Sequence, residues 1–306
     1  MREKVNGFVG VMAVAILCMV SGLCMVWGIA PVVLAVYVAA CAVCGRYMIT
    51  CIGCAAGVAA GSMGIAGLLH AYEYMIPGPV YSGVMVTEKY LVLLGLAMCL
   101  MKIVYSRNSG SYVRVIVVMS AAVLMGNIVV YADNMLMAAA YGVVEAAIFM
   151  CASVILKPGI GLLYTYICGD ASDVERDESW NISQGIVSLM ALAAVVLWVV
   201  PGEDIYGVNP AFMLALVLIL YAVYRTGAVY GCGMAAVAGS IVSVKLNDSR
   251  WLMWMLLVTL VMLIGRALTG RRKVSASLFY VLGCVLASVA DGTVLWNGSG
   301  REIAFY

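Results

Sequence analysis

Residues 136–156 read LMAAAYGVVEAAIFMCASVIL, an apolar run interrupted by a single charged side chain, Glu145. A helix needs about 20 consecutive, mostly apolar residues to cross the hydrocarbon core of a bilayer. The run reaches that length, and it therefore predicts a membrane-spanning helix. Glu145 falls near the middle of this predicted helix.

The composition of the whole chain agrees with that interpretation. Of its 306 residues 65% are hydrophobic and 10% are charged, and the mean hydropathy is +1.09. A soluble domain has roughly 45–50% apolar and about 25% charged residues, so this chain has more apolar surface than a soluble core can bury. We therefore predict an integral membrane protein whose partner is the lipid bilayer. The net charge of +2 gives no reason to expect nucleic acid.

The N-terminal segment, MREKVNGFVGVMAVAILCMVSGLCMVWGIA, begins with basic residues and continues as an apolar run. The apolar region of a cleaved signal peptide is about 7–15 residues long, and this run is longer. It is interpreted as an uncleaved first membrane helix, and no soluble domain is expected at either end.

Apolar runs recur along the rest of the chain. The predicted spans are 8–29, 31–44, 48–69, 90–105, 113–131, 136–156, 184–200, 210–224, 227–244, 251–268 and 274–290. The second is short and is interpreted as either a crossing helix or a re-entrant half-helix. The sequence thus predicts a single all-α domain, 1–306, built as a polytopic membrane bundle of about nine to eleven helices.

The basic residues predict the orientation of this bundle. If the N-terminus is cytoplasmic and every span crosses, 13 of the 17 Lys and Arg lie inside, and four lie outside (13 + 4 = 17). Lys and Arg resist translocation, so this bias favours a cytoplasmic N-terminus. The outer four are Lys89, Lys245, Arg250 and Arg301. The inner set includes a predicted cytoplasmic basic turn formed by Arg266, Arg271, Arg272 and Lys273.

The longest predicted cytoplasmic loop, 157–183, contains the acidic stretch GDASDVERDESWNISQG. It could dock a basic partner. The favoured interpretation is a solvated loop whose acidic residues precede the N-terminus of the next helix, where negative charge opposes the helix dipole favourably.

Glu145 is the principal candidate for a functional side chain. A carboxyl group inside a membrane is costly, and such a residue suggests a proton or ion site. It could equally be protonated, or hydrogen-bonded to a neighbouring helix as part of the packing. The sequence carries no phosphate-binding loop, no nucleophile elbow and no paired acidic motif, so no enzyme activity, metal or cofactor is predicted.

Four cysteines form two C-x-x-C pairs in the segment CAVCGRYMITCIGC, residues 41–54. Cys41, Cys44, Cys51 and Cys54 could bring thiolates together as metal ligands or as a redox pair. However, only six residues separate the pairs, and apolar flanks disfavour the thiolate. The favoured interpretation is that cysteine acts as a small apolar filler, with metal and redox sites as the alternatives.

Glycine recurs at every fourth position in two segments. Small residues at this spacing line one helix face and let helix backbones approach closely. The pattern predicts packing within the chain or, as the alternative, self-association. The residues concerned are Gly53, Gly57 and Gly61 in the first segment and Gly227, Gly231 and Gly239 in the second.

Five quoted stretches, taken in order, resemble the membrane region of stage II sporulation protein E from endospore-forming bacteria. They are SGLCMVWGIAPVVLAVYVAA, YGVVEAAIFMCASVI, DVERDESWNISQGIVSLMALAAVV, GAVYGCGMAAVAGSIVSV and VMLIGRALTGRRKVSASLFYVLG. Two features depart from the family pattern. Val32 and Val33 stand where Phe-Gly is expected, and the chain reaches Tyr306 with no phosphatase domain.

The resemblance implies a non-catalytic module for membrane anchoring, localisation and self-association. It places the chain in the bacterial plasma membrane at the sporulation septum, in contact with the cell-division machinery. In that family the membrane region precedes a metal-dependent serine phosphatase, so the resemblance also implies truncation before the catalytic domain. The alternative is a small-solute transporter, or the substrate-binding membrane subunit of one, that uses Glu145.

Overall fold

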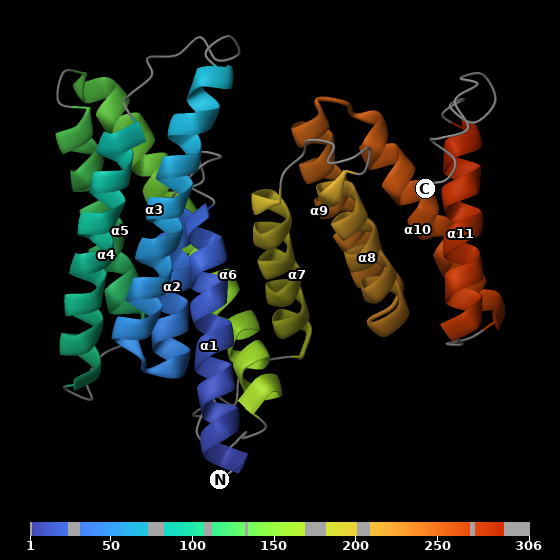
Figure 1. Cartoon of the computed structure of the whole chain (residues 1–306), viewed down its shortest axis with the longest axis horizontal. Helices are drawn as coiled ribbons and strands as arrows, with labels where there is room; N and C mark the ends of the chain where they lie inside the picture. The colour runs from blue at the N-terminus through green and yellow to red at the C-terminus, as the bar shows by residue number, and fades with distance from the viewer. Residues whose placement is uncertain are drawn as a thin grey trace. The chain divides into compact units, whose positions relative to one another are not determined.

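The computed structural model describes residues 2–23, 31–72, 83–106, 112–131, 134–168, 182–200, 209–269 and 273–290 (Figure 1). These residues form eleven helices, one at each predicted position. They are α1 (Arg2–Gly22), α2 (Pro31–Cys44), α3 (Tyr47–Tyr72), α4 (Gly83–Ser106), α5 (Tyr112–Val130), α6 (Met135–Cys168), α7 (Ile182–Val199), α8 (Pro210–Arg225), α9 (Ala228–Leu246), α10 (Arg250–Thr269) and α11 (Lys273–Ala290). The all-α prediction is confirmed for the described residues.

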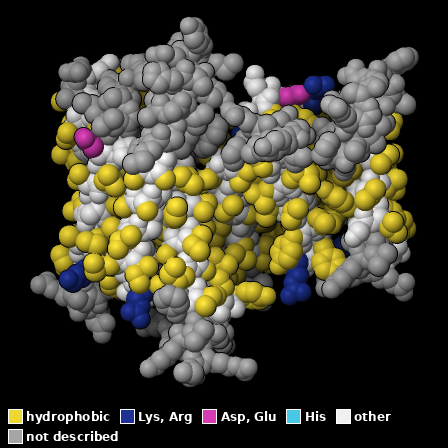
Figure 2. Space-filling model, in the orientation of Figure 1, with side chains coloured by type: hydrophobic (Ala, Val, Ile, Leu, Met, Phe, Trp, Pro, Cys, Tyr) yellow, Lys and Arg dark blue, Asp and Glu magenta, His cyan; other side chains and the backbone are white. Residues whose placement is uncertain are grey.

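Four of the helices are long and apolar enough to cross a membrane. They are Tyr112–Val130, Met135–Ile167, Ala228–Leu246 and Arg250–Thr269. Several others are apolar but shorter, α2 and α8 among them. Figure 2 shows hydrophobic side chains covering the flanks of the helices, while the charged side chains visible in this view lie near helix ends. By length and composition these helices are compatible with a membrane protein.

The chain divides into two compact units, Met1–Val195 and Val196–Tyr306. The sequence predicted a single domain and offered no boundary here. In the first unit α3, α4, α5 and α6 pack in succession, while α1 lies against α3 and α6. In the second unit α8, α9, α10 and α11 pack in succession, and α8 also contacts α10 and α11.

Helix α2 is the buried centre of the first unit. Every residue from Pro31 to Cys41 is buried, and α1, α3, α4 and α6 all pack on the helix. A helix that is apolar on all sides is stable only where other elements cover it completely. Its 14 residues span about 21 Å, less than the roughly 30 Å of a bilayer core. The short predicted second segment is thus a helix that other helices of the first unit enclose.

The first glycine pattern lies at the contact between α1 and α3. A Cβ atom on Gly57 would lie 2.0 Å from the Met19 carbonyl oxygen, and one on Gly53 would lie 2.7 Å from that of Ala15. On the α1 side, a Cβ on Gly22 would lie 2.6 Å from the Gly57 backbone. The two backbones thus touch, which only residues without a side chain allow. Gly61 is also buried.

The second glycine pattern lies in and next to α9. A Cβ on Gly231 would meet a methyl group of Val223 at 2.7 Å, and one on Gly239 would meet Leu252 at 2.9 Å. Gly227 precedes α9 with a φ of 106°, in the left-handed region that favours glycine. All three therefore serve packing or chain geometry inside the second unit.

Helix α6 runs past its predicted end at residue 156 and continues through Pro158 to Cys168. Proline removes one backbone donor and crowds the preceding turn, which frees nearby backbone groups from the helical pattern. Here the hydroxyl of Ser188 in α7 accepts a hydrogen bond from the Gly159 N–H, at 2.5 Å. The predicted loop 157–183 is therefore helical up to Cys168, and its acidic stretch lies outside the described residues.

Replacing Ser188 by alanine should destabilise the first unit by about 1–3 kcal/mol, because the buried Gly159 N–H loses its acceptor. Thermal unfolding of the purified chain in detergent would measure this loss. Ser240→Ala is the matched control, since Ser240 is exposed and its hydroxyl bonds only to the Ala236 carbonyl of its own helix. Equal unfolding temperatures for the two variants would contradict the role assigned to Ser188.

In the second unit, basic side chains bind the C-terminal carbonyl groups of neighbouring helices. The Arg266 guanidinium donates hydrogen bonds to the Val223 and Tyr224 carbonyls at the end of α8. The Lys245 ammonium likewise donates to the Leu197 and Val200 carbonyls at the end of α7. The last carbonyls of a helix have no partner within it, and their partial negative charge favours a cation.

The predicted cytoplasmic basic turn includes Arg266, whose side chain caps α8. Lys273 is the first residue of α11, and its side chain lies outside the described part of the chain. Arg271 and Arg272 also lie outside the described residues.

Candidate functional site

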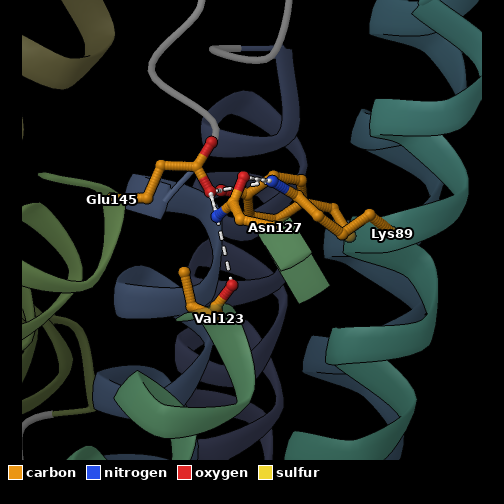
Figure 3. Close-up of polar contacts among 5 residues, drawn as sticks. Lys89, Val123, Asn127 and Glu145 are labelled. Atoms are coloured by element: carbon orange, nitrogen blue, oxygen red, sulfur yellow. Dashed lines mark hydrogen bonds and ion pairs between the residues drawn. The ribbon is translucent and has the colours of Figure 1, made fainter. Parts of the chain in front are cut away.

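Four polar side chains from three helices converge inside the first unit. They are Lys89 and Tyr90 of α4, Asn127 of α5 and Glu145 of α6, and Figure 3 shows Lys89 and Asn127 directed at the Glu145 carboxylate. Asn127 and Tyr90 are fully buried, and the Lys89 side chain is 4% exposed. Glu145 keeps 20% of its side chain exposed, so it is the most accessible member.

Three donors meet at one carboxylate oxygen. Glu145 Oε2 accepts hydrogen bonds from Lys89 Nζ at 2.7 Å, from Asn127 Nδ2 at 2.7 Å and from the Tyr90 hydroxyl at 3.0 Å. Asn127 Nδ2 also lies 3.1 Å from the Val123 carbonyl of its own helix. The donors therefore define a single point between α4, α5 and α6.

The lysine has partners besides the carboxylate. Its ammonium donates to Asn127 Oδ1 at 3.1 Å and lies 4.8 Å from the centre of the Tyr90 ring. A cation over an aromatic face is attracted by the ring quadrupole. Asn127 thus bridges the pair, accepting from Lys89 and donating to Glu145.

The two oxygens of Glu145 are used unequally. All three donors go to Oε2, and no described residue donates to Oε1. Charged hydrogen bonds of this length are among the stronger ones in proteins, and the pair carries no net charge. Burying either ion alone in apolar surroundings would cost free energy. The opposite charge of its partner offsets part of that cost.

Two glycines make room for the cluster. A Cβ on Gly126 would lie 3.3 Å from Lys89 Cγ, and one on Gly142 would lie 3.4 Å from Asn127 Cβ. Both distances are at or below ordinary contact, so the glycines let the lysine stem and the asparagine lie flat against α5 and α6. Tyr131 and Tyr141 stack beside the cluster, with ring centres 5.3 Å apart.

The site lies toward one end of the three helices. Lys89 is in the second turn of α4, Asn127 in the last turn of α5 and Glu145 in the third turn of α6. Glu145 had been placed near the middle of its helix, but α6 extends twelve residues beyond the predicted end (168 − 156 = 12), so Glu145 lies in its first third.

The sequence identified one of the four residues. Glu145 stood out as a charge inside an apolar run, whereas Lys89 was assigned to an outer loop. That assignment is corrected, because α4 begins at Gly83 and the lysine lies inside the helix. Asn127 and Tyr90 were not identified. The available signal was Asn127 itself, an amide in a long apolar run, which requires a hydrogen-bonding partner.

The cysteine segment is apolar in character. Cys41 and Cys54 are buried, Cys44 and Cys51 are half-buried, and the described cysteines are free thiols. Cys41 Sγ lies 3.2 Å from the Thr50 hydroxyl. Within the described ranges the side chains form no group of three or more metal-ligating residues. The geometry thus offers no support for the metal alternative.

Comparison with known proteins adds no assignment. The chain matches no protein-family model, no curated protein sequence and no solved structure. The functional argument therefore depends on the residues and geometry described above.

Proposed function

We propose that the chain is a non-catalytic, multi-pass membrane module that anchors and localises a complex in a bacterial plasma membrane. The observation that carries the proposal is the Lys89–Glu145 ion pair. Its charges are neutralised inside the chain, and Asn127 and Tyr90 add hydrogen bonds to Glu145 Oε2. A bundle with this kind of internal pairing can remain in lipid without a bound substrate.

The proposed topology has about nine to eleven spans and a cytoplasmic N-terminus. The orientation rests on the bias of Lys and Arg in the sequence, which is 13 inside and four outside when every span crosses. Lys89 lies inside α4, as Lys102 does, so the helix bounds add no further asymmetry.

The finer proposal follows the resemblance to the membrane region of stage II sporulation protein E. The chain would gather at the sporulation septum through the division machinery and would associate with itself. Gly53, Gly57, Gly231 and Gly239, whose spacing favoured self-association, already lie at the α1–α3, α8–α9 and α9–α10 contacts within the chain. Self-association would accordingly use other faces of the bundle.

A fluorescent fusion of the chain tests the proposed localisation. In a sporulating, endospore-forming host we expect enrichment at the asymmetric septum. The Glu145→Gln variant should keep this pattern, because an anchor needs a folded bundle and no transported ion. A uniform envelope signal from the folded fusion would overturn the septal proposal while leaving membrane insertion intact.

A second candidate function is transport of a small solute. The specific observation in its favour is the exposed edge of Glu145, whose Oε1 has no described donor although the residue sits in an apolar helix. Uptake by proteoliposomes that Glu145→Gln abolishes would favour the transporter over the anchor. Retained septal localisation without any solute flux would favour the anchor.

A further inference from the structure

We propose that Lys89, Asn127 and Tyr90 form a binding site for a small monovalent anion, which the carboxylate of Glu145 occupies as an internal ligand. This inference goes beyond the anchoring role, since an anchor needs no ligand. It starts from the convergence of three donors on one carboxylate oxygen.

The donor set has the chemistry of an anion site. A lysine ammonium, an amide N–H and a phenol O–H approach Glu145 Oε2 at 2.7, 2.7 and 3.0 Å. One full positive charge with two neutral donors matches one negative charge. Because the donors come from α4 and α5 and the acceptor comes from α6, the site keeps its donors when the carboxylate is removed.

The positions of the donors are set by contacts that do not involve Glu145. Lys89 is held by Asn127 Oδ1 at 3.1 Å and by the Tyr90 ring at 4.8 Å. Asn127 Nδ2 is also held by the Val123 carbonyl at 3.1 Å. An ammonium buried to 4% exposure and left without a carboxylate would need another anion nearby.

The internal ligand is the accessible partner. Glu145 retains 20% exposure, and its Oε1 has no described donor, so its side chain is the least enclosed member of the cluster. Rotation of the carboxylate away from the three donors would leave the Lys89 charge unmatched. A small anion in the place of Oε2 would then restore neutrality.

The charged and titratable groups around Glu145 are few. Lys89 and Tyr90 face it from α4, Asn127 faces it from α5, and the stacked Tyr131 and Tyr141 lie beside it. Helices α1 and α2 also pack on α6, but the described part of these helices makes no hydrogen bond or ion pair to Glu145. Among the described residues, the Glu145 carboxylate and the Lys89 ammonium are the charged pair of the site.

The test uses the purified full chain and compares its unfolding temperature in potassium chloride, formate and gluconate at equal ionic strength. Glu145→Ala empties the site, and we expect chloride or formate to raise its Tm by several degrees over gluconate, because a ligand of the folded state stabilises it. A response to chloride alone indicates a single-atom anion. A response to formate alone indicates the carboxylate of a small acid.

The Lys89→Met/Glu145→Ala double variant is the matched control and should show no difference between the salts. The wild-type chain, whose site holds the Glu145 carboxylate, should show a smaller difference than Glu145→Ala. Equal Tm values for Glu145→Ala in all three salts would overturn the proposal. So would a response that survives in the double variant. Should Glu145→Ala fail to fold, Glu145→Ser is measured in its place, and equal values in chloride and gluconate overturn the proposal.

Discussion

Replacing Lys89 by methionine, with Glu145 left in place, will destabilise the first unit by about 3–5 kcal/mol. The lysine ammonium is 2.7 Å from Glu145 Oε2, and its side chain is 4% exposed. Methionine has a similar length but no charge, so the carboxylate remains in an apolar bundle without its counter-ion. Asn127 and Tyr90 still donate to the carboxylate, but neither supplies a positive charge.

A double-mutant cycle measures this effect as an unfolding free energy in detergent. Lys89→Met and Glu145→Gln should each be costly, while Lys89→Met/Glu145→Gln should recover much of the loss, because no unpaired charge remains. Lys102→Met is the control, since Lys102 lies on an exposed face of the same helix and its loss should change stability by less than about 0.5 kcal/mol. Additive losses in the double variant would show that the two side chains do not interact.

The cycle also separates the two roles left open for Glu145. If the carboxylate serves only packing, the double variant regains stability and localises as the wild type does. If the carboxylate has a role in transport or binding, the double variant regains stability but not solute flux or ligand binding. Stability and function are therefore measured on the same protein, and one cannot be mistaken for the other.

The helices of this chain could be predicted because each apolar run is long enough to define a helix by itself. Pro31 marks the start of α2 in both the sequence and the structure. The ends of α4 and α6 could not be predicted, because they depend on partners elsewhere. Lys89, in the turn of α4 that the sequence missed, binds Glu145, and the continuation of α6 past Pro158 is accompanied by a hydrogen bond from the Gly159 N–H to Ser188.

The site was only partly predictable for a related reason. A charge in an apolar run is visible in the sequence, and this identified Glu145. Its partners lie 56, 55 and 18 residues away along the chain, and no sequence period connects them.

The glycines likewise indicated a contact without indicating its partner. Their spacing predicted close helix contact, but it could not tell that Gly57 meets Met19 of the same chain.

Gly57→Ala should destabilise the first unit by about 1–3 kcal/mol or more, because the added methyl group has no space. Its Cβ would lie 2.0 Å from the Met19 carbonyl oxygen and 2.9 Å from Gly22 Cα. Both atoms belong to the α1 backbone, so no side-chain rotation relieves the clash and the two helices must separate. Separation loses the dispersion contacts that hold helices together in lipid.

Gly95→Ala is the matched control, because a Cβ at Gly95 in α4 meets nothing within 4 Å. There the change should be neutral or stabilising by about 0.4–1 kcal/mol, through the lower entropy of the unfolded chain. The unfolding temperature and the monodisperse fraction in detergent are measured for both variants and compared with those of the wild-type chain. If Gly57→Ala behaves like Gly95→Ala, α1 and α3 do not touch as described.

Gly22→Ala widens the same contact from the other side. The Gly22→Ala/Gly57→Ala double variant should therefore lose less stability than the sum of the losses of the single variants. Once the helices have separated for one methyl group, the second finds the space already open.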